Sequence, residues 1–210
     1  IKDELNGKPL LTNKKEIILA LADLFKKSVA ACVAPKRLGI AFSGGVDSTL
    51  LAFLYRQHAI NYELYAVGLQ GSSDLEQAAL VAAKMKFPLK LRIISQNEAR
   101  DIVTDVVTAF KQADIPCNPM DVAIAAVIYA TLLNAQKDHI STVLYGMGMD
   151  SLFAGFDHHT DYKKSFTREI IQKNLWDSLN HVETTEIPRD QYIAQFANMN
   201  LVAPFLNEKL

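Results

Sequence analysis

The chain has 210 residues, of which 50% are hydrophobic, and its 22 Lys and Arg against 23 Asp and Glu give a net charge of −1. This composition is typical of a globular protein and excludes an intrinsically disordered one. The near-neutral charge offers no overall attraction for a polyanion, so we expect no nucleic-acid partner.

The length fits one domain spanning residues 1–210. Because the sequence lacks an initiator Met and stops three residues after Asn207, we expect a trimmed chain with functional residues beyond Leu210. The polar N-terminus predicts no signal peptide, and no apolar run approaches the ~20 residues that cross a bilayer. We therefore expect no membrane association, and residues 122–134 are interpreted as a buried helix.

Apolar periodicity and capping residues predict alternating helices and strands. Residues 1–37 are expected to form an extended lead-in and a helix that Asn13 caps and that ends before Pro35. Strands are predicted at 38–42, 63–70, 89–94 and 141–145. The first helix after a strand is predicted at 49–58, the second from Ser73 or Asp74 to Lys86, and the third from Ser95 or Asn97 past Phe110. A long fourth helix is predicted after the proline-containing loop 115–119 and ends at about Gln136. This order predicts an α/β fold with a parallel sheet, right-handed crossovers and helices on both faces.

The junction between the first strand and its helix carries the clearest chemical signal. It reads Ser43-Gly44-Gly45-Val46-Asp47-Ser48. The glycines allow positive φ and a close backbone approach, the helix start directs N–H groups at an anion, and the serines add hydroxyls. Asp47 would repel a phosphate unless a divalent cation lies between them, so the run predicts phosphate together with Mg²⁺. On spacing alone, a tight turn with a helix cap stays open as the alternative.

A second glycine turn follows a later strand, over residues 142–156. It places Tyr145 and Gly146 at the end of the strand and Asp150 at the start of the next helix. Since ligands bind at the carboxyl edge of such sheets, we expect Asp47 and Asp150 to lie close enough to share a cation. The chain has no Gly-Lys-Ser/Thr ending, which argues against a kinase or GTPase.

These pieces together resemble a known family. Residues 43–48 are similar to the pyrophosphate loop of the ATP pyrophosphatases, and residues 142–156 to the Ser-Gly-Glu-Gly-x-Asp-Glu-x-Phe-x-Gly-Tyr segment of the asparagine synthetases. Residues 204–207, preceded by Arg189-Asp190, resemble the Arg-Val-Pro-Phe-Leu-Asp segment of that family with its preceding Arg-Asp. Residues 67–78 resemble its second strand and following helix, and all four pieces fall in the family order.

The resemblance implies an adenine-nucleotide alpha-hydrolase-like fold of the PP-loop type, with ATP and Mg²⁺ as cofactors. It implies that Asp47 and Asp150 hold the metal and act in catalysis together with Arg189. It assigns the nucleotide to the following residues: Ser43, Gly44, Gly45, Val46, Asp47, Ser48, Val67, Gly68, Leu69, Tyr145 and Gly146.

The implied reaction is that of a carbon–nitrogen ligase. An amino acid or other carboxylate would be adenylated with release of pyrophosphate and would then receive nitrogen, as in asparagine biosynthesis. Nitrogen would come from ammonia, an amine or a separate glutaminase. Two free thiols, Cys32 and Cys117, fit a cytoplasmic protein, and the oligomeric state stays open.

The sequence departs from the family at five positions, two of which are Val202 and Ala203 in place of the Arg and Val of the segment before Pro204. Met147 and Ser151 stand where the asparagine synthetases carry Glu, and Asn207 replaces an Asp. A methionine cannot move a proton. Three alternatives therefore stay open: a nucleotide-binding module without turnover, a divergent synthetase such as a β-lactam-synthetase-like enzyme with another acceptor, and a flavodoxin-like protein with chance motifs.

Overall fold

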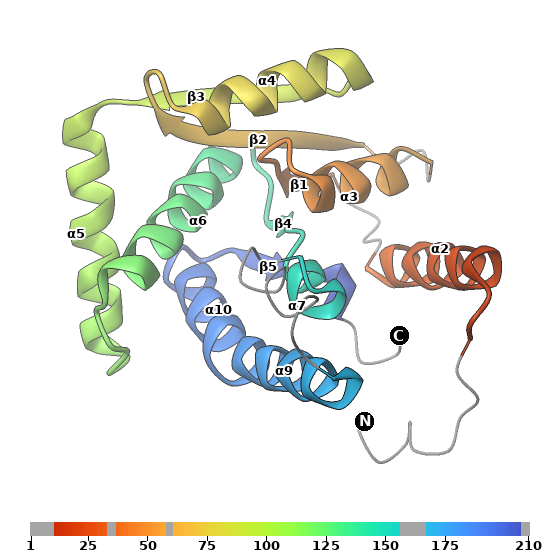
Figure 1. Cartoon of the computed structure of the whole chain (residues 1–210). Coiled ribbons are helices and arrows are strands. Elements are labelled where there is room, and N and C mark those ends of the chain that lie inside the picture. The colour runs from red at the N-terminus through yellow and green to blue at the C-terminus, as the bar shows by residue number, and fades with distance from the viewer. Residues whose placement is uncertain (1–10, 33–36, 58–60, 156–166, 207–210) are drawn as a thin grey trace.

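A computed structural model of the chain describes residues 11–32, 37–57, 61–155 and 167–206 (Figure 1). Within these residues, five strands form one sheet in the order β3-β2-β1-β4-β5, and every neighbouring pair is parallel. The strands are β1 Leu38–Ala41, β2 Tyr62–Leu69, β3 Leu89–Ile94, β4 Thr142–Leu144 and β5 Asn200–Val202. The predicted parallel α/β architecture is confirmed.

Helices cover both faces of the sheet (Figure 1). They are α2 Lys14–Ala31, α3 Val46–Gln57, α4 Ser73–Met85, α5 Gln96–Gln112, α6 Pro119–Lys137, α7 Met149–Phe153, α9 Arg168–His181 and α10 Ile187–Phe196, with a π-helical stretch Val182–Glu186 and a 3₁₀ turn Pro204–Leu206. Alternate strand residues enter two cores. Leu64 and Leu144 pack with α2, α3 and α4, whereas Tyr65 and Val143 pack with α5, α6 and α10. Burial on both faces explains why the strands are apolar runs without strict alternation.

Side-chain caps fix where several helices begin. The Asn13 side chain accepts from Lys15 N at 2.9 Å, as predicted. Ser95 opens α5 with a capping box, in which it and Glu98 satisfy each other's backbone N–H groups. The N-cap of α4 is Ser72, one residue before the predicted candidates, and α3 begins at Val46 rather than Thr49.

The C-terminal part of the described chain contains elements that the sequence patterns did not predict. α9, the π-helical stretch and α10 follow one another without a break, and β5 completes the sheet. Pro188 follows the π-helical stretch directly at the start of α10, and because it has no N–H it cannot donate the regular helical hydrogen bond there. β5 has only three residues, and its strand geometry depends on pairing with β4.

Helix α6 differs from the buried helix expected at residues 122–134. Its 19 residues are long and apolar enough, by length and composition alone, to cross a membrane, contrary to the sequence-based expectation. In the fold it contacts β2, α5 and α10. Yet Met120, Ile124 and Val127 are 70%, 37% and 57% exposed. Thus α6 is a core helix with one open apolar side.

Candidate active site at the switch point of the sheet

The strand order reverses between β1 and β4. From β1 the chain crosses to β2 on one side, whereas β4 leads to β5 on the other. In doubly wound sheets such a reversal opens a crevice beyond the carboxyl ends of the strands. Both glycine turns of the sequence follow these two strands, so both enter this crevice.

The first turn, residues 43–48, is held by its own serines. Ser43 N donates to Ser48 Oγ at 3.3 Å, the two hydroxyls lie 3.2 Å apart, and Gly45 N donates to Ser43 Oγ at 3.2 Å. The first helical hydrogen bond of α3 runs from Thr49 N to Gly45 O at 3.0 Å. The amides of Val46, Asp47 and Ser48 therefore lack intrahelical acceptors and are available to an anion, whereas those of Ser43 and Gly45 donate to the serine hydroxyls.

The glycines of both turns stand where the backbone has little room. Gly44 has φ +76°, and a Cβ there would approach Gln77 O on α4 to 2.8 Å. At Gly146 a Cβ would lie 3.0 Å from Asp47 Cβ and 3.2 Å from Ser48 N. The second turn therefore packs directly on the start of α3, and glycine is what permits this contact.

Asp47 and Asp150 each lie in the first turn of the helix that follows one of these glycine turns. Burial raises the pKa of Asp47, and the negative charge of Asp150 raises it further, which places the two carboxylates within electrostatic reach. Asp150 is exposed in the first turn of α7. In the described part of the chain no group of three or more His, Cys, Asp or Glu residues could hold a metal. Two carboxylates nevertheless fit Mg²⁺, which takes one or two of them together with phosphate oxygens and water.

A cavity of about 780 Å³ lies over this edge of the sheet. Its lining includes eight residues predicted for the nucleotide: Ser43, Asp47, Ser48, Val67, Gly68, Leu69, Tyr145 and Gly146. The remaining predicted residues, Gly44, Gly45, Val46, Asp150 and Arg189, do not line it. The first three belong to the turn itself, and the charge of Asp150 acts on Asp47, which does line the cavity.

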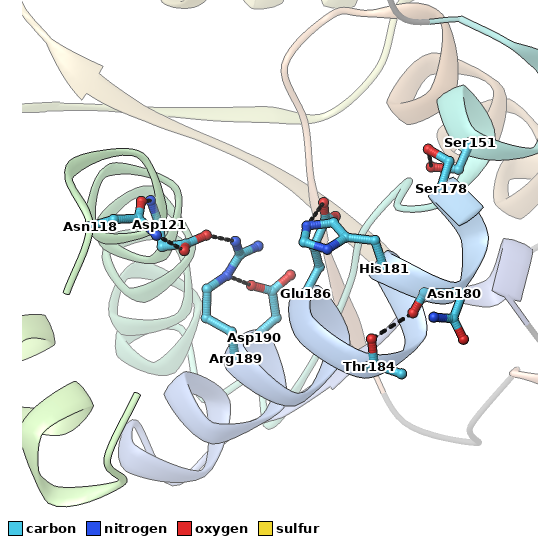
Figure 2. A network of polar contacts seen from close by, with 10 residues as sticks. All are labelled: Asn118, Asp121, Ser151, Ser178, Asn180, His181, Thr184, Glu186, Arg189 and Asp190. Carbon is cyan, nitrogen blue, oxygen red and sulfur yellow. Dashed lines mark hydrogen bonds and ion pairs between the residues drawn. The ribbon is translucent and has the colours of Figure 1, made fainter. Parts of the chain in front are cut away.

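Arg189 lies elsewhere, buried between α10 and α6 (Figure 2). Its Nε donates to Asp190 Oδ1 at 2.8 Å and its Nη1 to Asp121 Oδ1 on α6. Burial raises the pKa of Asp190 to about 6, although Arg189 and, more weakly, Tyr145 act in the opposite direction. Asp190 in turn raises the pKa of Tyr145, after the larger effect of burial. The structure therefore ties Arg189 to the site only indirectly, through the α10–α6 interface behind Tyr145.

The sequence patterns did not predict that helices α5 and α6 form a wall of the cavity. On one side the cavity is lined by Asp74 and Ser72 at the start of α4. The opposite wall comes from α5 and α6, through Ala99, Ile102, Val103, Ala123, Ile124, Ala126, Val127, Ile128, Ala130 and Thr131. The available signal was the composition of α6, which has apolar residues all round rather than on one face.

The parallel sheet, with a glycine turn after each of the two strands at its switch point, defines an α/β protein of the doubly wound class. The asparagine synthase family model matches residues 20–206. The chain therefore belongs to the asparagine synthase family.

Curated relatives agree with this family. A Methanocaldococcus jannaschii protein named as an asparagine synthetase (glutamine-hydrolysing) is 31% identical over 174 residues, covering 83% of this chain and 31% of that protein. Asparagine synthetase (glutamine-hydrolysing) 1 of Bacillus subtilis is 25% identical over 180 residues, covering 84% of this chain and 27% of its own length. The chain thus spans less than a third of these two relatives. A solved NH3-dependent NAD synthetase of Campylobacter jejuni has a TM-score of 0.43 and 15% identity, over 90% of this chain and 93% of that one.

Proposed function

We propose that this chain is an ATP-dependent carbon–nitrogen ligase domain that adenylates a carboxylate and then transfers the acyl group to nitrogen. The observation that carries the proposal is the contact of the two glycine turns, with Asp47 and Asp150 in electrostatic reach of each other next to a cavity of about 780 Å³. That volume lies in the range of ligand and cofactor sites.

In this proposal the phosphates of ATP lie over residues 43–48, where free amides of α3 face them. The adenine lies against Val67, Gly68 and Leu69 at the end of β2. Asp47 and Asp150 hold Mg²⁺, which when bound neutralises the charge that develops on the leaving pyrophosphate. Tyr145 and Gly146 close the cavity on the side of β4.

The chemistry has two steps. A carboxylate oxygen of the substrate attacks the α-phosphorus, and the bond from that phosphorus to the bridging oxygen of the β-phosphate breaks, which yields an acyl-adenylate and pyrophosphate. A nitrogen nucleophile then attacks the acyl carbon, AMP leaves with the bonding electrons, and the nitrogen loses a proton. Amides fixed at the turn contribute by stabilising charge without reorganisation.

We propose ammonia, an amine substrate or a separate glutaminase as the nitrogen source, and the cytoplasm as the compartment. The described cysteines, Cys32 and Cys117, are free thiols, which a reducing compartment preserves. Arg189 is proposed to act by positioning Tyr145 and α6 rather than by touching substrate, because ion pairs with Asp190 and Asp121 hold it behind the cavity.

A second candidate is a nucleotide-binding module without turnover. Met147 favours it, because this residue lines the cavity and its thioether cannot accept a proton from an attacking amine. Under this candidate ATP binds and no AMP forms.

The test incubates the chain with ATP, Mg²⁺, ammonia and a panel of carboxylic acids and measures AMP and pyrophosphate. We expect both products with at least one acid, and their loss in Asp47→Ala and in Asp150→Ala. Asp177→Ala, an exposed Asp of α9, is the matched control and keeps activity. If ATP raises the melting temperature but no acid yields AMP, the module is supported instead. Failure of ATP to bind contradicts both.

A further inference from the structure

Gly155 follows α7, the short helix that carries Asp150, and the Asp150 carboxylate occupies the space where a side chain of residue 155 would lie. A Cβ at Gly155 would overlap Asp150 Oδ1 and would lie 3.1 Å from both Asp150 Cα and Asp150 Cγ. The φ of Gly155 lies outside the left-handed region, so the backbone conformation does not require glycine here. The carboxylate of Asp150 is what requires it.

The backbone of Gly155 is fixed against the start of the same helix. Its N–H donates to Asp150 O at 2.9 Å. Ala154, the C-cap of α7, has φ +56° and turns the chain back at this point. Residue 155 therefore cannot retreat from Asp150 without losing this hydrogen bond.

Helix α7 is also held in place, although five residues are too few for a helix that is stable alone. Phe153 contacts Phe25 of α2 edge to face, with ring centroids 6.0 Å apart. Ser151 is buried, and its hydroxyl lies 3.4 Å from that of Ser178 on α9 (Figure 2). With α7 and residue 155 both fixed, the Asp150 side chain is the part that moves most easily when the space beside it is filled.

The orientation of this carboxylate matters for a magnesium ion. Asp150 is exposed, so several rotamers would be open to it without a neighbour that selects one. Mg²⁺ demands near-ideal octahedral geometry, with oxygen ligands at about 2.0–2.1 Å. A carboxylate turned to another rotamer therefore no longer fits the same ion as Asp47.

We propose that Gly155 is a positioning residue for Asp150: because it has no side chain, it leaves the space from which the Asp150 carboxylate binds Mg²⁺ together with Asp47. This inference rests on the proposed function, which makes Asp150 a ligand of the metal. It goes further because Gly155 does not line the cavity and has no side chain to contribute. Its effect on the metal runs through Asp150.

The test measures ATP binding by isothermal titration, with and without Mg²⁺, on the parent, Gly155→Ala, Asp150→Asn and the double variant. We expect Gly155→Ala to lower the Mg²⁺-dependent gain in ATP affinity by about tenfold or more, the scale of losing a group that orients a metal ligand. Binding of ATP alone should be unchanged. Because Gly155 acts through the carboxylate, the double variant should behave as Asp150→Asn does.

Two measurements separate this effect from a loss of folding. The melting temperature of Gly155→Ala should fall by about 4 °C at most, because turning one exposed side chain to another rotamer costs little. Crystal structures of the metal-free parent and Gly155→Ala should show the Asp150 carboxylate in different rotamers on the same α7 backbone. Gly71→Ala, the matched control, adds the same methyl group where no described atom lies within 4 Å and should keep the full gain from Mg²⁺.

Three results would overturn the inference: an undiminished gain from Mg²⁺ in Gly155→Ala, an unchanged Asp150 rotamer in its crystal structure, or a further loss in the double variant beyond that of Asp150→Asn. An undiminished gain in Gly155→Ala that disappears in Asp150→Asn would keep the proposed metal site and reject the role of Gly155. The absence of any gain in the parent would instead refute the shared ion of the proposed function. A displaced Asp150 carboxylate in Gly155→Ala would then still support the positioning role.

Discussion

Gly44 is the residue at which the proposed phosphate-binding turn can be tested most specifically, by replacement with alanine. Its φ of +76° is unfavourable for a residue with a Cβ, which costs about 1–2 kcal/mol, partly offset because alanine restricts the unfolded chain. In addition the new Cβ would lie 2.8 Å from Gln77 O, 2.9 Å from Gln77 C and 3.0 Å from Ala78 Cα, all backbone atoms of α4. Such overpacking costs about 1–3 kcal/mol.

Replacing Gly71 by alanine measures the cost of the positive φ without the cost of a contact with α4. Gly71 has nearly the same φ, +77°, but no described atom lies within 4 Å of the position that an added Cβ would take. Gly71→Ala should therefore lower the free energy of unfolding by about 1 kcal/mol, the conformational part alone. Gly44→Ala should lower it by about 2–4 kcal/mol, because the contact with α4 is added.

The assay is urea unfolding of both variants and the parent, followed by circular dichroism, with the stabilisation by ATP and Mg²⁺ measured alongside. For a chain of this size each kcal/mol shifts the melting temperature by about 2–4 °C. We expect Gly44→Ala also to weaken ATP binding, because relieving the contact displaces the amides of residues 43–48. Equal stability of the two variants, or undiminished ATP binding in Gly44→Ala, would refute the placement of this turn against α4.

Three further predictions concern buried charge and helix capping. Arg189→Met leaves Asp190 and Asp121 without their shared cation. It should lower the free energy of unfolding, measured in urea, by about 3–5 kcal/mol. An effect below about 1 kcal/mol, the scale of an exposed pair, would show that the ion pair is not buried. Because burial raises the pKa of Asp190 to about 6 in the folded state, against about 3.9 unfolded, the folded state binds the proton more tightly. The protonated Asp190 therefore adds to the free energy of unfolding, fully below the unfolded pKa, and this addition of about 3 kcal/mol is lost as the pH rises through the folded pKa. Urea unfolding at a series of pH values should show this decrease in the parent and not in Asp190→Asn. Ser95→Ala removes one half of the capping box of α5 and should lower the free energy of unfolding by about 1 kcal/mol. An unchanged free energy of unfolding would mean that Glu98 alone is enough to cap α5.

The features that the sequence predicts well are those that local chemistry determines. The third strand is predicted at residues 89–94, as observed, because the helix stop at Phe87-Pro88 and the cap at Ser95 enclose it. The turn at residues 43–48 is predictable because paired glycines between an apolar run and a helix favour a tight turn, with or without a bound anion. Strand polarity predicts that Asp47 and Asp150 reach the same edge of the sheet, whereas their sharing of a cation stays a prediction.

The features that the sequence does not predict depend on contacts between distant segments. β5 is a strand because Thr142 to Leu144 provide its partners, and three residues carry no periodicity of their own. The position of Arg189 depends on how α10 packs against α6, so a motif could suggest proximity to the site but not the ion pairs that hold it behind Tyr145. The apolar wall arises only when α5 and α6 meet above the sheet.

The central claim is that Asp47 and Asp150 share one Mg²⁺ with bound nucleotide. Isothermal titration of ATP with and without Mg²⁺, on the parent, Asp47→Asn, Asp150→Asn and the control Asp177→Asn, tests it most directly. We predict that Mg²⁺ tightens ATP binding in the parent and the control, and that this gain disappears in each of the two site variants. A gain from Mg²⁺ that persists undiminished in either site variant would contradict the shared ion.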